Sequence, residues 1–145
     1  MNGDTIPDNN HIARLCLPKH VDNEQIQATA FQLRPPNELF LSVNWLEFLN
    51  CPSRESEIEE IQKVYCTKLD VRPHAKIAVL NVSEVRKKVL TESQDRRNIE
   101  VLHNPEEPVD PSHSGIYNLK QNDEIEIAEL ILQTVQETYP ARTQK

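Results

Sequence analysis

The chain has 145 residues and a net charge of −7, from 16 Lys and Arg against 23 Asp and Glu. This length suits one domain, and 37% hydrophobic with 27% charged residues excludes a wholly disordered chain. No apolar run approaches the roughly 20 residues that span a bilayer, and having only two glycines, Gly3 and Gly115, excludes a glycine-rich phosphate loop.

The first half of the chain predicts three strands. Residues 1–10 are polar and are expected to form a disordered tail. A short apolar run over 12–17 stops at a proline and predicts the first strand. Weak alternation over 28–33 predicts the second strand. The most apolar stretch predicts the third strand over 39–43, followed by a short helix or bend over 44–50.

The second half predicts three helices and two strands. Apolar residues at spacings of three and four predict a helix over 53–69. A continuous apolar run over 77–82 predicts a buried strand, after which Ser83 is expected to cap a second helix. Another strand is expected over 98–103, and Asp123 is expected to cap a last helix that runs to residue 138.

This order of elements predicts an α+β fold. We expect a single domain over 11–139, with a C-terminal tail over 140–145. Its core is expected to be one mixed or mainly antiparallel sheet of about four or five strands, packed against about three helices and covered mainly on one face.

Three cysteines indicate the cellular compartment. Cys16, Cys51 and Cys66 form no C-x-x-C pair and are odd in number, which argues against a disulfide framework and favours a reducing cytosol. The polar N-terminus also lacks the apolar stretch of a secretory signal. We therefore expect a cytoplasmic protein that does not bind membranes.

Three residues in loops are candidates for catalysis. His113 lies between Ser112 and Ser114, where a histidine beside hydroxyls can act as a general base. Ser112, His113 and Ser114 are also candidates for binding. The same string also forms a good tight turn, with Gly115 supplying a positive φ. His20 and Arg34 lie in two other loops, and all three residues would form an anion-handling site if they met in one pocket.

The segment around the single tryptophan is a further candidate for binding. Trp45 is interpreted as a core anchor, with an exposed aromatic patch as the alternative. Asn44 and Glu47 are the polar residues beside it that are most suited to binding. No histidine or cysteine pair has the spacing of a zinc site, so we expect no metal and no cofactor.

Charge is unevenly distributed along the chain. Nine acids and one base lie between Glu100 and Glu137, a net charge of −8. The last predicted helix carries Glu126 and Glu129, which form either a solvated face or a docking face for a basic partner. The basic residues over 86–97 are interspersed with acids and have no aromatic residues among them, so direct nucleic-acid binding is not expected.

Three groups of segments together carry a resemblance to a known family. These are residues 11–16 with Pro18 and His20, residues 30–34 with 41–47, and residues 110–116. The set resembles a family of small uncharacterised bacterial proteins, and within it the small accessory proteins encoded beside type III-E CRISPR nuclease–protease loci. The resemblance extends from about residue 11 to 137.

The resemblance implies a regulatory, defence-associated interaction protein. Its implied partners are the large CRISPR accessory protein that the associated protease cuts, or an extracytoplasmic-function sigma factor. The resemblance implies no activity for any named residue. The alternative that the residues themselves suggest is a small enzyme, a hydrolase or transferase. It would act on a nucleotide or phosphate-containing substrate through His20, Arg34 and His113.

Overall fold

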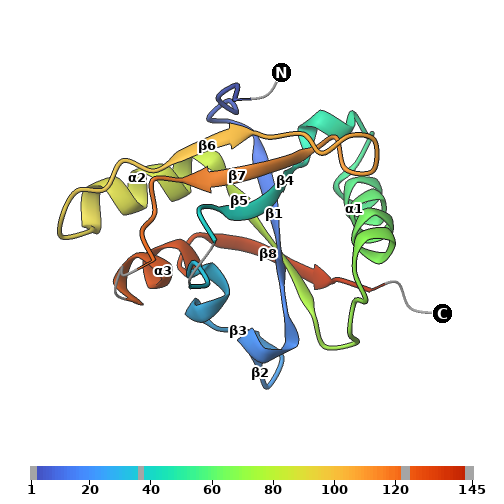
Figure 1. The fold of residues 1–145 in the computed structure, drawn as a ribbon, viewed down its shortest axis with the longest axis horizontal. Coiled ribbons are helices and arrows are strands. Elements are labelled where there is room, and N and C mark those ends of the chain that lie inside the picture. The colour runs from blue at the N-terminus through green and yellow to red at the C-terminus, as the bar shows by residue number, and fades with distance from the viewer. Residues whose placement is uncertain (1–2, 36–37, 122–124, 143–145) are drawn as a thin grey trace.

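The structure is a computed structural model that describes residues 3–35, 38–121 and 125–142. Its centre is a six-stranded antiparallel sheet in the order β6-β7-β4-β1-β5-β8 (Figure 1). The strands are β1 (His11–Cys16), β4 (Leu41–Trp45), β5 (Lys76–Asn81), β6 (Glu100–His103), β7 (His113–Tyr117) and β8 (Val135–Pro140). A separate two-stranded sheet is formed by β2 (Val21–Asp22) and β3 (Gln25–Ile26).

Three α-helices and three short 3₁₀ helices surround the main sheet. The α-helices are α1 (Arg54–Lys68), α2 (Val82–Glu92) and α3 (Ile125–Leu132). The 3₁₀ helices are η1 (Pro18–His20), η2 (Ala28–Phe31) and η3 (Glu47–Leu49). The α+β prediction is therefore confirmed, with six strands in the main sheet rather than four or five. Within the described residues, no helix is long and apolar enough to cross a membrane.

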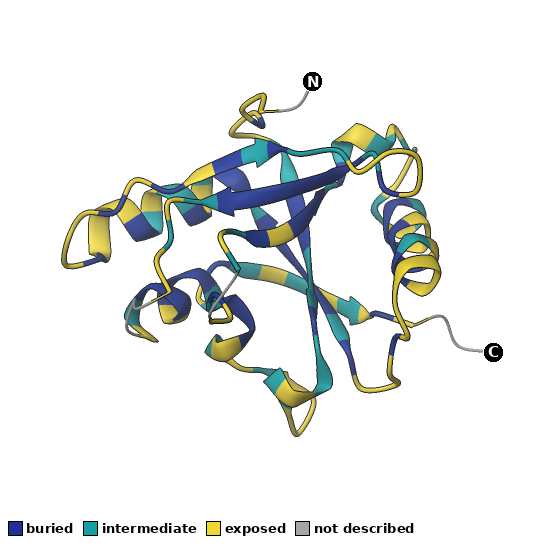
Figure 2. Cartoon of the chain, viewed as in Figure 1, coloured by how far each residue is buried: buried dark blue, intermediate teal, exposed yellow. Residues whose placement is uncertain are grey.

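Helices cover both faces of the sheet, not mainly one. Ile12, Ala78 and Leu80 pack in a core with α2, α3 and η2, whereas Ala13, Ile77 and Val79 pack against α1. Figure 1 accordingly shows α1 on one side of the strands and α2 and α3 on the other. The physical reason lies in β5, because an uninterrupted apolar strand is one that is buried on both faces. Figure 2 shows this burial along the central strands.

Two strands differ from the sequence prediction. Residues 113–117, expected as a turn, form β7, which pairs with both β4 and β6. Residues 135–140, expected as the end of the last helix, form β8, which pairs with β5 along the edge of the sheet. Val135 continues the helical spacing of α3, but Val, Thr and Tyr in this segment also favour a strand, and pairing with β5 decides between them.

Two smaller local predictions also differ. Residues 28–33, expected as a strand, contain η2, whose Ala30 and Phe31 are buried in the core beside α3. The cap of α2 is Asn81 rather than Ser83, since its side chain accepts a hydrogen bond from the Glu84 amide at 2.9 Å. The expected cap Asp123 lies outside the described residues.

The described part of the expected N-terminal tail is paired with the sheet. The Gly3 amide donates to the His103 carbonyl at 2.6 Å, and the Ile6 amide donates to the Val101 carbonyl at 3.0 Å. Ile6 is completely buried in the core. At the other end, Pro140 belongs to β8 and Ala141 is buried, although both were expected in a tail. A lone apolar residue among polar ones gives no periodic signal, which is why neither segment was recognised.

The burial of Ile6 gives a test of this correction. The variant Ile6→Ala should lose about 2–5 kcal/mol of unfolding free energy, because it leaves a cavity in the core. The control Ile125→Ala removes an isoleucine that is 38% exposed and should lose less than about 1 kcal/mol. Urea unfolding followed by circular dichroism measures both losses. Equal losses in the two variants would contradict the packing of Ile6 in the core.

Candidate functional site

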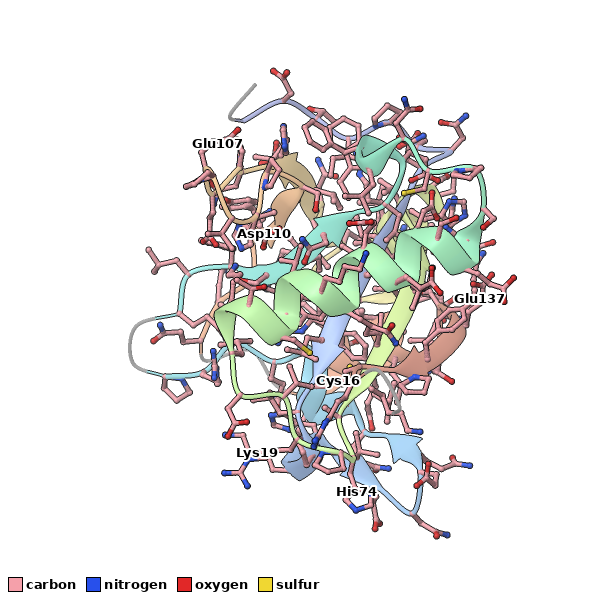
Figure 3. All side chains as sticks on the ribbon, turned by 90° about the vertical axis from the view of Figure 1, so that its right-hand side faces the viewer. Cys16, Lys19, His74, Glu107, Asp110 and Glu137 are labelled. Carbon is pink, nitrogen blue, oxygen red and sulfur yellow. The ribbon has the colours of Figure 1, made fainter. Side chains whose placement is uncertain are left out.

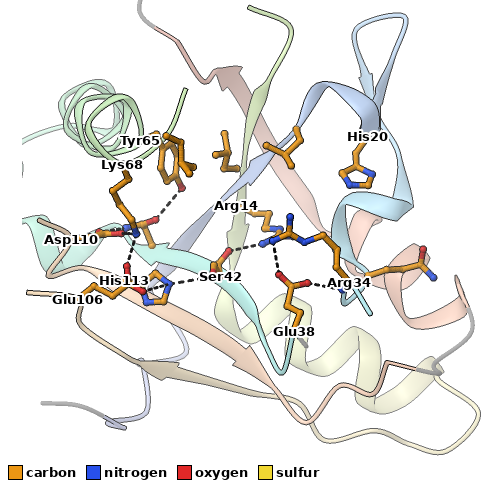
Figure 4. A pocket seen from close by; sticks show the side chains of 15 residues that line it. Arg14, His20, Arg34, Glu38, Ser42, Tyr65, Lys68, Glu106, Asp110 and His113 are labelled. Carbon is orange, nitrogen blue, oxygen red and sulfur yellow. Dashed lines mark hydrogen bonds and ion pairs between the residues drawn. The ribbon is translucent and has the colours of Figure 1, made fainter. Parts of the chain in front are cut away.

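A cavity of about 340 Å³ lies at the end of the sheet where β1 and β4 separate. Its lining includes His20, Arg34 and His113, the three residues expected to form an anion-handling site if they met. Figure 4 shows them around one pocket, with Lys68 and Asp110 on the side of α1 and with Arg14 and Ser42 between the two groups. The three residues thus line one cavity, although His113 lies in strand β7 and not in a loop.

Arg14 occupies the gap between the two strands. β1 and β4 pair at two positions, Ile12–Trp45 and Ala13–Asn44. Beyond these positions β1 stays paired with β5, and β4 stays paired with β7. In the gap, Arg14 donates from Nε to the Ala30 carbonyl at 3.0 Å and from Nη1 to the Ser42 carbonyl at 2.9 Å. The guanidinium thus pairs with the Ser42 carbonyl of β4 and links that strand to Ala30 of η2.

The charge of Arg14 faces the pocket without a paired carboxylate. Burial lowers its pKa, but an arginine with so high an ordinary pKa remains charged near neutral pH. No carboxylate of the described residues forms an ion pair with it, and its Nη2 has no acceptor among them. Arg14 is therefore a fixed cation at the bottom of an open cavity.

The opposing strands bring His113 to Ser42. Asn44 lies directly opposite His113 in the ladder, and Ser42 is two residues further along β4 on the same face. This diagonal relation puts the two side chains within reach. His113 Nε2 lies 3.2 Å from Ser42 Oγ, and His113 Nδ1 lies 2.8 Å from the Asn104 carbonyl oxygen. Because a carbonyl only accepts, Nδ1 carries a proton, and Nε2 without a proton can accept from the Ser42 hydroxyl. Glu106 Oε2 lies 3.7 Å from the same Nε2.

Gly115 leaves room for neighbouring aromatic rings and does not form a turn. It lies directly opposite Ser42 in the ladder, and a Cβ added there would meet the Phe40 ring at 2.6 Å and the Tyr117 ring at 2.8 Å. Those two rings stack on each other with centroids 4.9 Å apart. The expectation of a positive-φ glycine in a tight turn was wrong, because residues 113–117 are extended and paired on both sides.

Lys68 joins α1 to the loop that precedes β7. Its Nζ donates to Glu106 Oε1 at 2.5 Å and to Asp110 Oδ2 at 2.8 Å. Burial lowers the pKa of Lys68, but its hydrogen bonds to Asp110 and Glu106 outweigh this effect and the pKa is raised. The hydrogen bond from Lys68 lowers the pKa of Glu106 in turn. The same loop carries the Asn104 carbonyl that orients His113.

A buried polar network supports this side of the pocket. The Asn44 amide donates to Asp110 Oδ1 at 2.7 Å and to Ser112 Oγ at 2.9 Å, and the Tyr65 hydroxyl donates to Asn44 Oδ1 at 3.0 Å. Figure 3 shows α1 in front of the sheet, with Asp110 beside it. Of the predicted binding residues, Asn44 thus lines the pocket, while Ser112 and Ser114 are buried behind it.

The other side of the pocket is cationic. His20 accepts from or donates to Thr29 Oγ1 at 2.8 Å. Burial lowers the pKa of His20, and the positive charges of Lys19, Arg14 and Arg34 lower it further. Arg34 is more than half exposed, and it forms an ion pair with Glu38 at 3.1 Å. His20 is therefore neutral near pH 7, and a bound anion would offset the positive charges around it.

The remaining predicted residues lie elsewhere. Glu47 accepts from the His11 amide and lies 2.7 Å from His11 Nδ1, away from the residues that line the cavity. Trp45 is half-buried against the core and donates to Asn10 Oδ1 at 2.7 Å, which agrees with an anchoring role. Glu126, on α3, accepts from the Gln94 amide at 3.1 Å.

The described acidic residues between 100 and 137, which exclude Asp123 and Glu124, lie on more than one surface. Glu106 and Asp110 pair with Lys68 in the pocket, whereas Glu137 on β8 pairs with Arg54 of α1 at 3.2 Å. Glu126 and Glu129 lie on α3, which packs on the opposite face of the sheet from α1. A docking face on α3 would therefore rest on these two glutamates rather than on the whole acidic segment.

Sequence analysis did not identify three central residues of the pocket. Arg14 had a usable signal, because a charged residue inside an apolar strand must find partners. Ser42 and Lys68 had none, since each occupies an ordinary position in a strand or helix. Among the described residues, no group of three or more His, Cys, Asp or Glu side chains is placed to hold a metal ion.

Comparison with known proteins gives no match to a protein-family model, a curated protein or a solved structure. Function is therefore argued from the pocket alone.

The Lys68 ion pairs give a testable prediction for stability. Lys68→Met removes the cation beside a carboxylate that is 1% exposed and should cost about 2 kcal/mol of unfolding free energy at pH 7, less than for a fully buried pair. Glu106 has its pKa lowered from 4.5, so its contribution is present above that pH and is lost as the pH falls through the folded value. The difference between the two proteins should thus shrink at about pH 3.

Lys63→Met is the matched control for this measurement. Lys63 lies on the same helix and pairs with Glu60 at 3.5 Å on the surface, so its loss should cost less than about 1 kcal/mol. Urea unfolding at both pH values measures all three proteins. Equal stability of the Lys68 and Lys63 variants at pH 7 would contradict the proposed anchoring of the loop.

Proposed function

We propose that this protein is a small enzyme, a hydrolase or transferase, that acts on a phosphate-containing substrate in the cavity. The observation that carries this proposal is the convergence of His20, Arg34 and His113 on the same cavity, together with Arg14. These residues come from four separate parts of the chain. Together they place anion-binding arginines near His113, a histidine that can transfer protons.

The cationic side of the cavity supports binding of a phosphate group. Guanidinium groups present several donors in a plane and suit phosphate oxygens better than a single ammonium does. Arg14 is fixed by two backbone carbonyls, so little conformational freedom is lost when its free Nη2 binds an anion. On this side, Glu38 is the carboxylate that pairs with Arg34. Lys68 already pairs with two carboxylates, so we assign it a structural role.

The opposite side supplies a base. His113 is buried, its Nδ1 proton is held by the Asn104 carbonyl, and its Nε2 faces the cavity lining at Ser42. A histidine fixed in one tautomer is suited to accept a proton during attack on a substrate and to return it to the leaving group. Arg14 and Ser42 lie between the cationic side and His113, so an anion bound at Arg14 lies beside the base.

A regulatory interaction role in a CRISPR-associated system stays a prediction. It came from the resemblance, and the α3 glutamates offer it a smaller acidic surface than the sequence suggested. The cavity favours the enzyme because it brings the candidate residues together. Charge reversal at Glu126 and Glu129 remains the direct test of a docking role on α3.

Phosphate binding at His20 tests the proposed function. Inorganic phosphate should raise the pKa of His20, because a negative charge stabilises the imidazolium that Lys19, Arg14 and Arg34 disfavour. The ring resonances of His20, followed by NMR over a pH series with and without phosphate, measure this shift. If millimolar phosphate leaves the His20 titration unchanged, the cavity is not a phosphate site.

Two arginine variants test whether Arg34 itself contributes to phosphate binding. Arg34→Gln should weaken phosphate binding about tenfold, which corresponds to one lost charged contact. Arg72→Gln is the matched control, because Arg72 is also exposed and pairs with a nearby acid, Asp70, but does not line the cavity. Equal affinity in the two variants would remove Arg34 from the proposed site.

A further inference from the structure

We propose that Ser42 is the nucleophile of the cavity and that His113 is its base, so that a phosphate ester is cleaved through a covalent phosphoserine. The substrate class rests on the proposed function, whereas the assignment of Ser42 rests on the geometry around β4 and β7. Ser42 would be a catalytic residue, since its oxygen forms and breaks the bond to phosphorus.

The first argument is the arrangement of nucleophile, base and orienting group. Ser42 is exposed and lines the cavity, and its Oγ lies 3.2 Å from His113 Nε2. The Asn104 carbonyl oxygen accepts from His113 Nδ1 at 2.8 Å. The Phe40 ring packs against the imidazole in a T-shaped arrangement, with the ring centroids 6.0 Å apart. This linear order of hydroxyl, imidazole and acceptor is the pattern that activates a serine in enzymes of many folds.

The second argument is the fixed cation beside Ser42. Arg14 donates to the carbonyl of Ser42 itself at 2.9 Å, so its guanidinium is held next to the nucleophile. A phosphoryl group in transfer carries its charge on its outer oxygens, and a positioned guanidinium stabilises that charge. Arg14 Nη2, which has no acceptor among the described residues, is the donor available for this purpose.

The third argument is that the other nucleophilic groups fit worse. Ser112 and Ser114 are buried and donate within the protein, to Asp110 and to the Ser112 carbonyl. Burial raises the pKa of the Cys16 thiol to about 12, so it is not ionised. Thr29 is also exposed and bonded to a histidine, but it does not line the cavity.

The reaction balances with water as the second substrate. Ser42 Oγ attacks phosphorus while His113 Nε2 takes the hydroxyl proton, and the bond from phosphorus to the ester oxygen breaks as that oxygen receives the proton from His113. Water then attacks the phosphoserine, with its proton taken by His113. The bond from phosphorus to Ser42 Oγ breaks, inorganic phosphate leaves, and the proton returns to Ser42.

Diisopropyl fluorophosphate tests Ser42 without knowledge of the substrate. An activated serine attacks its phosphorus and releases fluoride, and the adduct is located by intact-mass and peptide mass spectrometry. We expect one adduct, on Ser42, that disappears in Ser42→Ala and persists in Thr29→Ala, the control for a hydroxyl bonded to another histidine. His113→Gln should slow labelling about 100-fold. Circular dichroism confirms that each variant is folded.

The outcomes separate this inference from the proposed function. An adduct on Ser42 together with phosphate binding at His20 supports both. Phosphate binding with no adduct on folded protein overturns Ser42 as the nucleophile and leaves the anion site standing. An adduct on Ser42 without phosphate binding supports the nucleophile and overturns the phosphate substrate class. An adduct that survives Ser42→Ala overturns the assignment.

Discussion

The separation of β1 from β4, bridged by Arg14, is the constraint on which the site depends. Two adjacent antiparallel strands normally satisfy each other's backbone groups, and a gap between them leaves carbonyls without donors. Arg14 fills this gap with one side chain that donates to the Ser42 carbonyl of β4 and to the Ala30 carbonyl of η2. Arg14 therefore has two roles. Its hydrogen bonds close the gap in the structure, and its positive charge lines the cavity.

The two sides of the cavity differ in how their charges are balanced. On the side of α1, Lys68 pairs with both Glu106 and Asp110, which leaves one negative charge, and these ion pairs fix the loop that orients His113. On the opposite side, Arg34 pairs with Glu38, and burial together with the charges of Lys19, Arg14 and Arg34 lowers the pKa of His20. A rigid base therefore faces a region with excess positive charge, which is the distribution that a phosphate ester requires.

β7 explains why one segment carries so many of the site's features. The ladder with β4 puts His113 opposite Asn44 and Gly115 opposite Ser42. His113 thereby reaches the Ser42 hydroxyl, while the missing side chain at Gly115 accommodates the stacked Phe40 and Tyr117 rings. The string of hydroxyls, histidine and glycine that suggested a turn is a strand whose alternate residues face the pocket and the core.

The sequence by itself determined the α+β class, helix α1, the buried strand β5, and His20, Arg34 and His113 as candidates for chemistry. Local periodicity and residue type carry that information, since a helix stripe or an apolar run is visible within a few residues. Only the tertiary structure decided that the three candidates meet, that Ser42 and Arg14 join them, and that residues 113–117 and 135–140 are strands. Strand pairing joins residues that lie far apart in the sequence, such as Leu41 and Ile116, and no local pattern records that register.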